Sequence, residues 1–445
     1  MKIKINKYFS DFFINGWNLN INNELEVEYV DANQFLRPER IDLVCKLFYI
    51  YCKEHNRNMD LAKKIYTEHL RAFSYGTFKE PGSNDKDSIE KYFSVFDQLI
   101  NEIKERGFDA EKSVIPVGDN NSILDGSHRT AIAIYYGIKL PIVRIHGISK
   151  VYDYEFFLSR KIDKRCLDFM SFLYINFHDC CYVACIWPRA DNNKKIKLAE
   201  KIIKKSCGIV YKKRIKFNYH GIEQLMVHFY GNQEWAGNVE NKFKGIPFKA
   251  NQCFKKFSFT TIYVLSGCSL NDVINIKAQI RDIFGINNHS IHITDTKMEA
   301  INAGQELLFQ DSINILNYGG IFDKPLLVKK IIDFKDMQSD NYIITKETIK
   351  MFYDLKNHQT GKVDFEVKEF DNNEKFGYIL GMKFSPISKK DLKYREKFRY
   401  CINLIHKGVI EDCLTKLNVS FRIKQIFIKF LDIVGISWHK KEHLK

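Results

Sequence analysis

The chain has 445 residues, and 69 Lys and Arg against 54 Asp and Glu give it a formal net charge of +15. Hydrophobic residues make up 45% and aromatic residues 14%, which excludes an intrinsically disordered chain and indicates several folded domains. No apolar run approaches the ~18 residues of a membrane span, and the N-terminus lacks the long apolar segment of a secretory signal, so we expect a cytoplasmic protein. The positive charge favours an anionic partner: nucleic acid, anionic lipid or a phosphorylated substrate.

The eleven cysteines are scattered, and no pair forms a Cys-x-x-Cys motif. Cys180, Cys181 and Cys185 lie near His178, which suggests a zinc site. Adjacent cysteines are poorly spaced for one metal, however, and their neighbours are apolar. We therefore expect buried, reduced thiols at these positions.

Hydrophobic periodicity predicts a mixed first unit. The expected elements are a strand at 26–30 and helices at 38–56, 61–73 and 89–106. Asp87 or Ser88 can cap the last helix, and Gly107 ends it.

The stretch 115–145 is the most informative part of the chain. Apolar residues at 122–124 predict a short strand, and the Asp-Gly pair that follows predicts a tight turn. A buried helix then runs to Gly137, and Pro141 marks the next strand at 142–145.

The polar residues of this stretch gather where the helix begins. Free backbone N–H groups and the positive end of the helix dipole form an anion site there. His128 and Arg129 add donors at the same point, while Asp125 can cap the turn, bind a metal or accept a proton.

Asp125, Gly126, Ser127, His128 and Arg129 form an Asp-Gly-x-His-Arg sequence between an apolar strand and a helix. This arrangement resembles the ParB/sulfiredoxin-like superfamily, which includes ParB proteins, sulfiredoxin and free-serine kinases. The resemblance covers residues 113–145 and implies a nucleotide whose phosphates rest on the turn. It implies ATP and Mg²⁺ as cofactors, with nucleotide contacts from residues 126–130, including Thr130, and Asp125 as the metal-orienting carboxylate. The alternative is a surface turn that only caps the helix.

A Gly- and Pro-containing polar loop at 75–86 is a second candidate for chemistry. Kinases of the superfamily that the motif resembles use a carboxylate near the nucleotide to activate the acceptor hydroxyl. Glu80 is the candidate for this role, and Lys86 or Lys79 is the candidate phosphate contact. The assignment rests on role rather than on a matched motif, and the alternative is a solvated loop.

The region from Lys195 to about Gly320 is predicted to form a second mixed unit. The expected helices are 196–205, 221–230, 271–284 and 299–309, and the expected strands are 208–217, 257–265 and 289–295. This region resembles domains encoded in bacterial surface-polysaccharide gene clusters, but no catalytic motif accompanies the resemblance.

Two places in the second unit can carry chemistry. His292, Asp295 and Glu299 can share a cation or a proton at a strand end, although capping by Thr294 or Asp295 is an alternative. The second place combines charged residues with a tryptophan, which suits a phosphorylated or glycosyl ligand, and a basic loop is the alternative. Its members are Glu234, Trp235, Lys244 and Lys249.

A third unit is expected at 321–415. A helix at 345–355 precedes a strand at 361–367 that places Asp364 and Glu366 on one face. This order resembles a nucleotidyltransferase-like fold, in which paired carboxylates hold Mg²⁺. The Gly-Ser phosphate turn usual before that strand is absent, and two exposed acids on a half-buried strand are the alternative. Another strand is expected at 378–384, followed by a basic helix at 389–405.

The tail at 416–445 carries a predicted basic amphipathic helix. Its apolar residues, including Trp438, share one face that lysines flank. Such a helix suits an anionic membrane surface, and packing on the protein body is the alternative.

Taken together, the sequence predicts a multidomain α+β protein. The expected segments are a nucleotide-binding domain at 1–150, a packing segment and linker at 151–194, mixed units at 195–320 and 321–415, and the tail at 416–445.

The leading hypothesis is an ATP-dependent kinase acting on a sugar or polyol hydroxyl in capsule or lipopolysaccharide synthesis. The protein would be bifunctional if the third unit is active. It would be cytoplasmic, and peripheral at the inner membrane face if the tail binds lipid. The alternatives are a ParB-like CTP- and DNA-binding protein or nuclease, and a non-catalytic scaffold. Nucleic acid is the less favoured partner, because no helix-turn-helix follows the motif.

Overall fold

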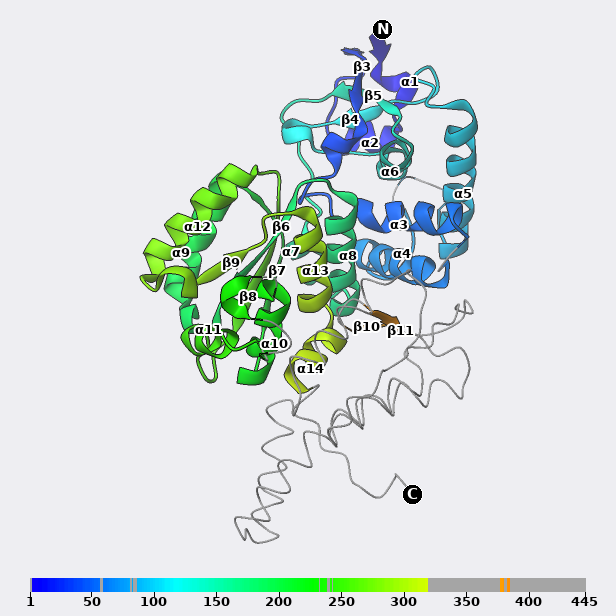
Figure 1. Cartoon of the computed structure of the whole chain (residues 1–445). Helices are drawn as coiled ribbons and strands as arrows, with labels where there is room; N and C mark the ends of the chain where they lie inside the picture. Colours follow the sequence, from blue (N-terminus) through cyan, green and yellow to red (C-terminus); the bar gives the residue numbers. More distant parts are fainter. Residues whose placement is uncertain are drawn as a thin grey trace, which may run out of the picture.

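The computed structural model describes residues 2–318, apart from 57–58, 81, 83–85, 232, 238–240 and 242, together with 377–379 and 382–384. Within these residues helices combine with several small sheets, which confirms the α+β class. Figure 1 shows an N-terminal body and a second body built on a four-stranded sheet, with helix α8 (Lys164–Phe177) between them.

The N-terminal unit is built on a three-stranded sheet of order β3-β5-β4. β4 (Ile115–Val117) and β5 (Lys139–Arg144) are parallel because α6 (Ser127–Tyr136) crosses back between them, whereas β3 (Glu28–Asp31) is antiparallel to β5. A separate two-stranded sheet joins β1 (Lys2–Lys4) to β2 (Glu24–Glu26). The remaining elements of the unit are α1 (Ile5–Tyr8), α2 (Asp11–Gly16), η1 (Ala32–Phe35), α3 (Leu43–Glu54), α4 (Met59–Ser74), α5 (Ile89–Arg106) and η2 (Asp119–Asn121).

The helices of this unit lie where the sequence predicts them, and some of their ends coincide with the predicted ones. α5 has the predicted bounds: the Ser88 side chain accepts from Lys91 N–H, and Gly107 follows with φ +73°. α6 ends before Gly137 as predicted. The helix predicted from residue 38 begins only at Leu43, however, and residues 122–124 form a single bridge, Val117 to Ile123, rather than a strand.

Two helices connect the units. α7 (Tyr154–Ser159) leads into α8, ten of whose residues are buried. α8 packs against α3 on one side and against α13 (Lys297–Leu307) on the other. One hydrophobic core therefore continues from the N-terminal unit through α8 to one face of the second sheet.

The second sheet has the order β7-β8-β6-β9, with every neighbouring pair antiparallel. Its strands are β6 (Cys181–Ile186), β7 (Gly208–Ile215), β8 (Thr260–Ser266) and β9 (Ile291–Ile293). α9 (Asn193–Ser206) and α12 (Leu270–Phe284) cover one face through a second hydrophobic core. The other helices are η3 (Pro188–Ala190), α10 (Tyr219–Tyr230), η4 (Glu234–Ala236), α11 (Ile246–Cys253), η5 (Asn287–His289) and α14 (Gln310–Tyr318).

β6 lies inside this sheet although it precedes residue 195, where the sequence suggested that the unit begins. All six of its residues are buried, because both faces of the strand are covered. The strand predicted at 289–295 is shorter than expected, and Thr296, not Thr294 or Asp295, caps the following helix. Cys207 and Cys268 form a disulfide that joins the start of β7 to the end of β8.

Two further strands are described after residue 318. β10 (Gly377–Ile379) and β11 (Met382–Phe384) pair antiparallel, so the structure has two short strands where the sequence predicted one at 378–384. Asp364, Glu366 and the tail at 416–445 lie outside the described residues. No helix in the described part of the chain is long and apolar enough to cross a membrane.

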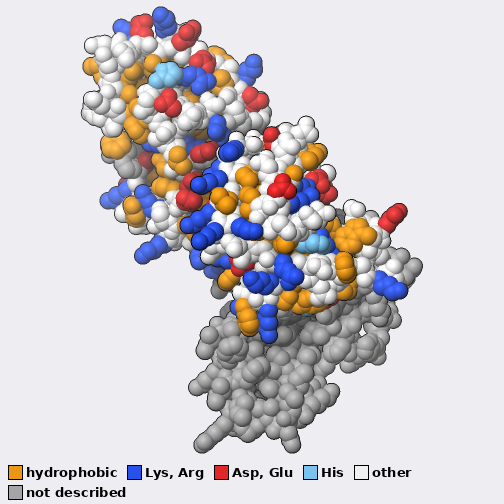
Figure 2. All heavy atoms as spheres, turned by 90° about the vertical axis from the view of Figure 1, so that its left-hand side faces the viewer, with side chains coloured by type: hydrophobic (Ala, Val, Ile, Leu, Met, Phe, Trp, Pro, Cys, Tyr) orange, Lys and Arg blue, Asp and Glu red, His pale blue; other side chains and the backbone are white. Residues whose placement is uncertain are grey.

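The surface of the second unit is basic on the side where α9 lies. Lys and Arg side chains gather there in Figure 2. The exposed lysines of α9 are Lys194, Lys197, Lys201, Lys204 and Lys205.

Candidate functional site

The first candidate site is the turn that opens α6. Gly126 has φ +82°, and a Cβ there would lie 2.4 Å from Cδ1 of Ile115 and 2.9 Å from Nη2 of Arg129. The first hydrogen bond of the helix runs from Thr130 N–H to the Gly126 carbonyl. The backbone N–H groups of residues 127–129 meet no acceptor within the described residues, so they are available to an anion.

Two cations and one carboxylate surround this turn. Arg129 lies 3.4 Å from Asp125 and is 21% exposed, whereas Asp125 is 53% exposed. Lys150 donates to the Leu124 carbonyl at 2.8 Å, and burial lowers its pKa while the charge of Asp125 raises it. The turn is therefore a partly exposed site with two hydrogen-bond donors beside it, Arg129 and Lys150.

The side chain of His128 points away from the turn into the aromatic core. Its Nε2 lies 2.6 Å from the Tyr66 hydroxyl, and its ring contacts Phe96 edge-on at 4.8 Å. Burial lowers the pKa of His128 well below its usual range, and the charge of Lys46 lowers it further. His128 is therefore neutral, and the donor that it offers to an anion at the turn is its backbone N–H.

The 75–86 loop lies next to this core. Glu80 forms an ion pair with Lys86 at 2.7 Å, and Lys86 Nζ lies 5.6 Å from the centre of the Tyr92 ring. Burial and then the charge of Glu80 raise the pKa of Tyr92. The Lys86 charge also lowers the pKa of His128, after burial and Lys46. The structure thus brings Glu80, Lys86 and the residues of the turn into one region. Lys79, the alternative phosphate contact, makes no side-chain bond within the described residues.

A buried ionic network that was not predicted from the sequence lies next to the same region. Asp42 accepts from Arg40 Nε at 2.8 Å and from Lys46 Nζ at 3.0 Å, and all three side chains are at most 3% exposed. Lys46 Nζ lies 3.2 Å from Nε2 of His69. Arg40 also donates to the Ile123 carbonyl at 2.9 Å, which fixes the chain just before the turn. The sequence hints at this network through Lys46, a lysine inside the apolar run of α3.

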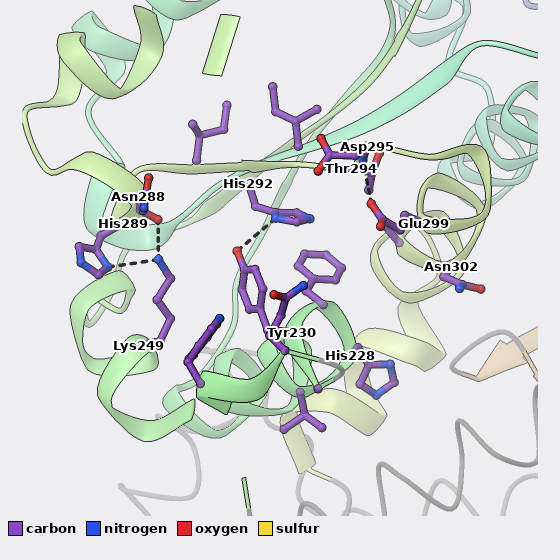
Figure 3. Close-up of a pocket in the computed structure, with 18 of the residues that line it drawn as sticks. His228, Tyr230, Lys249, Asn288, His289, His292, Thr294, Asp295, Glu299 and Asn302 are labelled. Atoms are coloured by element: carbon purple, nitrogen blue, oxygen red, sulfur yellow. Dashed lines mark hydrogen bonds between the residues drawn. The ribbon is translucent and has the colours of Figure 1, made fainter. Parts of the chain in front are cut away.

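The second candidate site is a cavity of about 710 Å³ in the second unit. Residues of α10, α12, β9 and α13 line it, and Trp235, Phe248 and Lys249 contribute from neighbouring segments (Figure 3). The cavity contains three of the predicted site residues, His292, Asp295 and Glu299, together with Trp235 and Lys249. Residues of the two candidate sites that the sequence suggested in this unit therefore line one pocket. Glu234 and Lys244 are not among its lining residues.

The predicted residues at the end of β9 have defined partners. His292 Nδ1 lies 3.1 Å from the Tyr230 hydroxyl, and its ring stacks on Phe229 at 4.6 Å. Burial lowers the pKa of His292 to about 3, so the ring is neutral. Asp295 pairs with Lys277, and Glu299 accepts from the Asp295 N–H at 2.8 Å. In the part of the chain that the structure describes, no cluster of three His, Cys, Asp or Glu side chains is arranged to hold a metal.

The cavity also contains residues that the sequence gave no reason to select. Arg281 of α12 lines the wall, and its buried Nε has no hydrogen-bond partner. His228 Nδ1 lies 2.5 Å from Glu306, and these two side chains are 2% and 3% exposed. No local pattern links His228 with Glu306, because they lie 78 positions apart.

The cysteines near His178 occupy different environments. Cys181 and Cys185 are buried in β6, whereas Cys180 is exposed and its N–H donates to His178 Nδ1 at 3.1 Å. Burial raises the pKa of the Cys181 and Cys185 thiols.

No family model matches the chain, and neither the curated proteins nor the solved structures contain a match.

Proposed function

We propose that the protein is a nucleotide-dependent phosphotransferase that holds the phosphates of ATP at the start of α6. The observation that supports this most is the set of backbone N–H groups at 127–129 without an acceptor in the described residues. Phosphate oxygens accept from such groups, and the helix dipole favours their charge. Gly126 keeps the turn open, since any side chain there would meet Ile115 and Arg129.

The charged side chains around the turn have complementary roles in this proposal. Arg129 and Lys150 would neutralise phosphate charge. Mg²⁺ in such sites is held mainly by phosphate oxygens and water, so the single exposed carboxylate of Asp125 is sufficient on the protein side. Phosphoryl transfer needs mostly positioning and charge stabilisation, which a compact basic turn can supply.

Glu80 is the proposed proton acceptor for the attacking hydroxyl. It lies in the loop next to the Tyr66, Tyr92 and His128 cluster, where Lys86 holds it. A hydroxyl that enters between the loop and the turn would exchange the Lys86 contact for its own hydrogen bond to Glu80. Lys86 would then be free to contact the transferred phosphoryl group.

The proposed acceptor is a sugar or polyol hydroxyl in bacterial capsule or lipopolysaccharide synthesis. This part rests on the resemblance of residues 195–320 to domains of polysaccharide gene clusters. A cytoplasmic location, with peripheral attachment to anionic lipid through the tail, is consistent with the use of ATP as the phosphoryl donor.

Transfer of the γ-phosphoryl group tests the proposal. The full chain is incubated with Mg-ATP and a panel of hexoses, pentoses and polyols, and phosphorylated products are measured. We expect transfer to at least one acceptor, loss of transfer in Glu80→Gln, and unchanged transfer in Glu102→Gln, which removes an exposed carboxylate of α5. Selective binding of CTP, with salt-sensitive binding of DNA and no transfer, would favour the ParB-like alternative instead.

A further inference from the structure

Two of the cations that line the cavity of the second unit, Lys249 and Arg281, form no ion pair within the described residues. The buried Nε of Arg281 has no hydrogen-bond partner within the described residues, although the guanidinium carries a charge and five N–H donors. Lys249 donates to the Asn288 carbonyl at 2.6 Å and lies 3.4 Å from His289 Nδ1, so its described partners are neutral. Both cations line the same cavity.

These two cations act on each other across the cavity wall. Burial lowers the pKa of Lys249, and the charge of Arg281 lowers it further. Both residues line the same cavity, and like charges in a partly buried wall are unfavourable unless an anion joins them. The third cation, Lys277, pairs with Asp295 and is therefore already compensated. Because neither Arg281 nor Lys249 has an ion-pair partner in the described residues, we expect an anionic ligand group beside them.

The opposite end of the cavity offers hydrogen-bond acceptors. Glu299, Asn302 and the buried His228 line this end, and Figure 3 shows them on the side away from Lys249. His228 is held by Glu306 through Nδ1, and its Nε2 is buried without a hydrogen-bond partner. The Glu299 carboxylate and the Asn302 amide oxygen can accept from hydroxyl groups, and the unpartnered His228 Nε2 offers a further hydrogen-bonding position.

Aromatic side chains form the mouth of the cavity. Trp235 is 47% exposed and Phe248 72% exposed, and both line the pocket. Tyr230 continues this surface inward, with its ring 5.4 Å from that of Trp235. Exposed aromatic rings beside hydroxyl acceptors provide an apolar surface for the C–H face of a sugar ring.

We propose that this cavity binds a phosphorylated sugar or polyol, with the phosphate at Arg281 and Lys249 and the hydroxyl groups at Glu299, Asn302 and His228. The cavity of about 710 Å³ is large enough for such a compound. The site shares no residue with the turn of α6, so this inference goes beyond the phosphotransferase proposal and does not depend on it.

Isothermal titration of the full chain with sugar phosphates tests this inference. The panel contains hexose and pentose phosphates, the matching unphosphorylated sugars, inorganic phosphate and AMP. We expect at least one sugar phosphate to bind more tightly than its sugar, inorganic phosphate or AMP. Arg281→Gln is expected to weaken that binding about tenfold to a hundredfold, because it removes charged hydrogen bonds to phosphate.

Two further variants separate the ends of the cavity. Glu299→Gln is expected to weaken binding of the sugar phosphate while leaving that of inorganic phosphate unchanged. Arg106→Gln, the same charge change on the exposed end of α5, is expected to have no effect. Arg129→Gln is expected to leave sugar phosphate binding intact, which distinguishes this cavity from the α6 turn.

The outcomes decide the inference directly. Retention of full affinity in Arg281→Gln, or no saturable binding by any panel member, would overturn it. Tighter binding of AMP than of every sugar phosphate would replace the sugar class by a nucleotide. Equal binding of inorganic phosphate and sugar phosphates would remove the role of the hydroxyl acceptors. Thermal unfolding without ligand provides the folding control: Arg281→Gln should not lower Tm, because it removes an unpaired charge.

Discussion

The Tyr66 hydroxyl lies 2.6 Å from Nε2 of His128, and this contact joins α4 to the start of α6. The Tyr66 carbonyl lies 2.6 Å from Nδ1 of His69, whose Nε2 faces Lys46. Polar contacts on both ends of Tyr66 therefore connect the buried pair of Asp42 and Lys46 with His128, the second residue of α6.

Removing the Tyr66 hydroxyl tests this link. Tyr66→Phe leaves His128 Nε2 buried without a partner, so we expect the free energy of unfolding to fall by about 1–3 kcal/mol. Chemical denaturation measures the change. Tyr29→Phe, at a tyrosine that is 56% exposed, is the control and should match the native chain. Equal stability of both variants would mean that the Tyr66 contact does not hold α6.

The buried ionic network predicts a large effect for one carboxylate. Asp42→Asn leaves Arg40 and Lys46 buried without a counter-charge, so we expect a loss of about 3–5 kcal/mol in unfolding free energy. Guanidinium denaturation provides the measurement, with Glu102→Gln, an exposed pair member, as the neutral control. A variant as stable as the control would show that the network does not need its negative member.

The buried histidines predict a fall of stability in mild acid. Burial lowers the pKa of His69 and His292 from 6.5 to about 3, and that of His128 well below its usual range. Because the pKa is lower in the folded state, their contribution is complete above pH 6.5 and is lost as the pH falls toward 3. Each of these histidines should lower the free energy of unfolding by ~1.4 kcal/mol per pH unit below 6.5.

Urea unfolding between pH 7.5 and pH 5 tests the titration, since carboxylates remain largely ionised there. His292→Phe should reduce the slope of the unfolding free energy against pH by the equivalent of one proton. A pH-independent stability over this interval would contradict the neutral state of the three rings.

The two glycines that flank α6 form a matched pair. Both have positive φ, +82° at Gly126 and +65° at Gly137, but only at Gly126 would a Cβ meet other atoms. Alanine at either position should cost about 1–2 kcal/mol for its backbone conformation. Gly126→Ala should in addition weaken Mg-ATP binding, because Ile115 and Arg129 must shift. Equal nucleotide affinity of the two variants would argue against phosphates on this turn.

The sequence predicts local features better than pairings across the chain. Ser88, Gly107 and Gly137 mark helix ends by their own chemistry, so those ends are placed correctly. β6 is missed because a strand covered on both faces has no alternation and looks like any short apolar run.

The same limit applies to the candidate sites. The turn at 125–130 is contiguous and was visible in the sequence, whereas the cavity combines residues from α10, α12, β9 and α13. Arg281 resembles an ordinary solvent-facing residue of an amphipathic helix, and only the fold shows that it lines a cavity. The pair of His228 and Glu306 depends on the packing of α10 against α13, which no local pattern encodes.

The most direct test of the central proposal is the affinity of the full chain for Mg-ATP, compared between the native protein, Arg129→Gln and Arg106→Gln. ADP, CTP and GTP complete the panel. The proposal predicts saturable binding of ATP that falls at least about tenfold in Arg129→Gln and is unchanged in Arg106→Gln. Absence of binding by all four nucleotides, or equal affinity in both variants, would contradict a phosphate site at the start of α6.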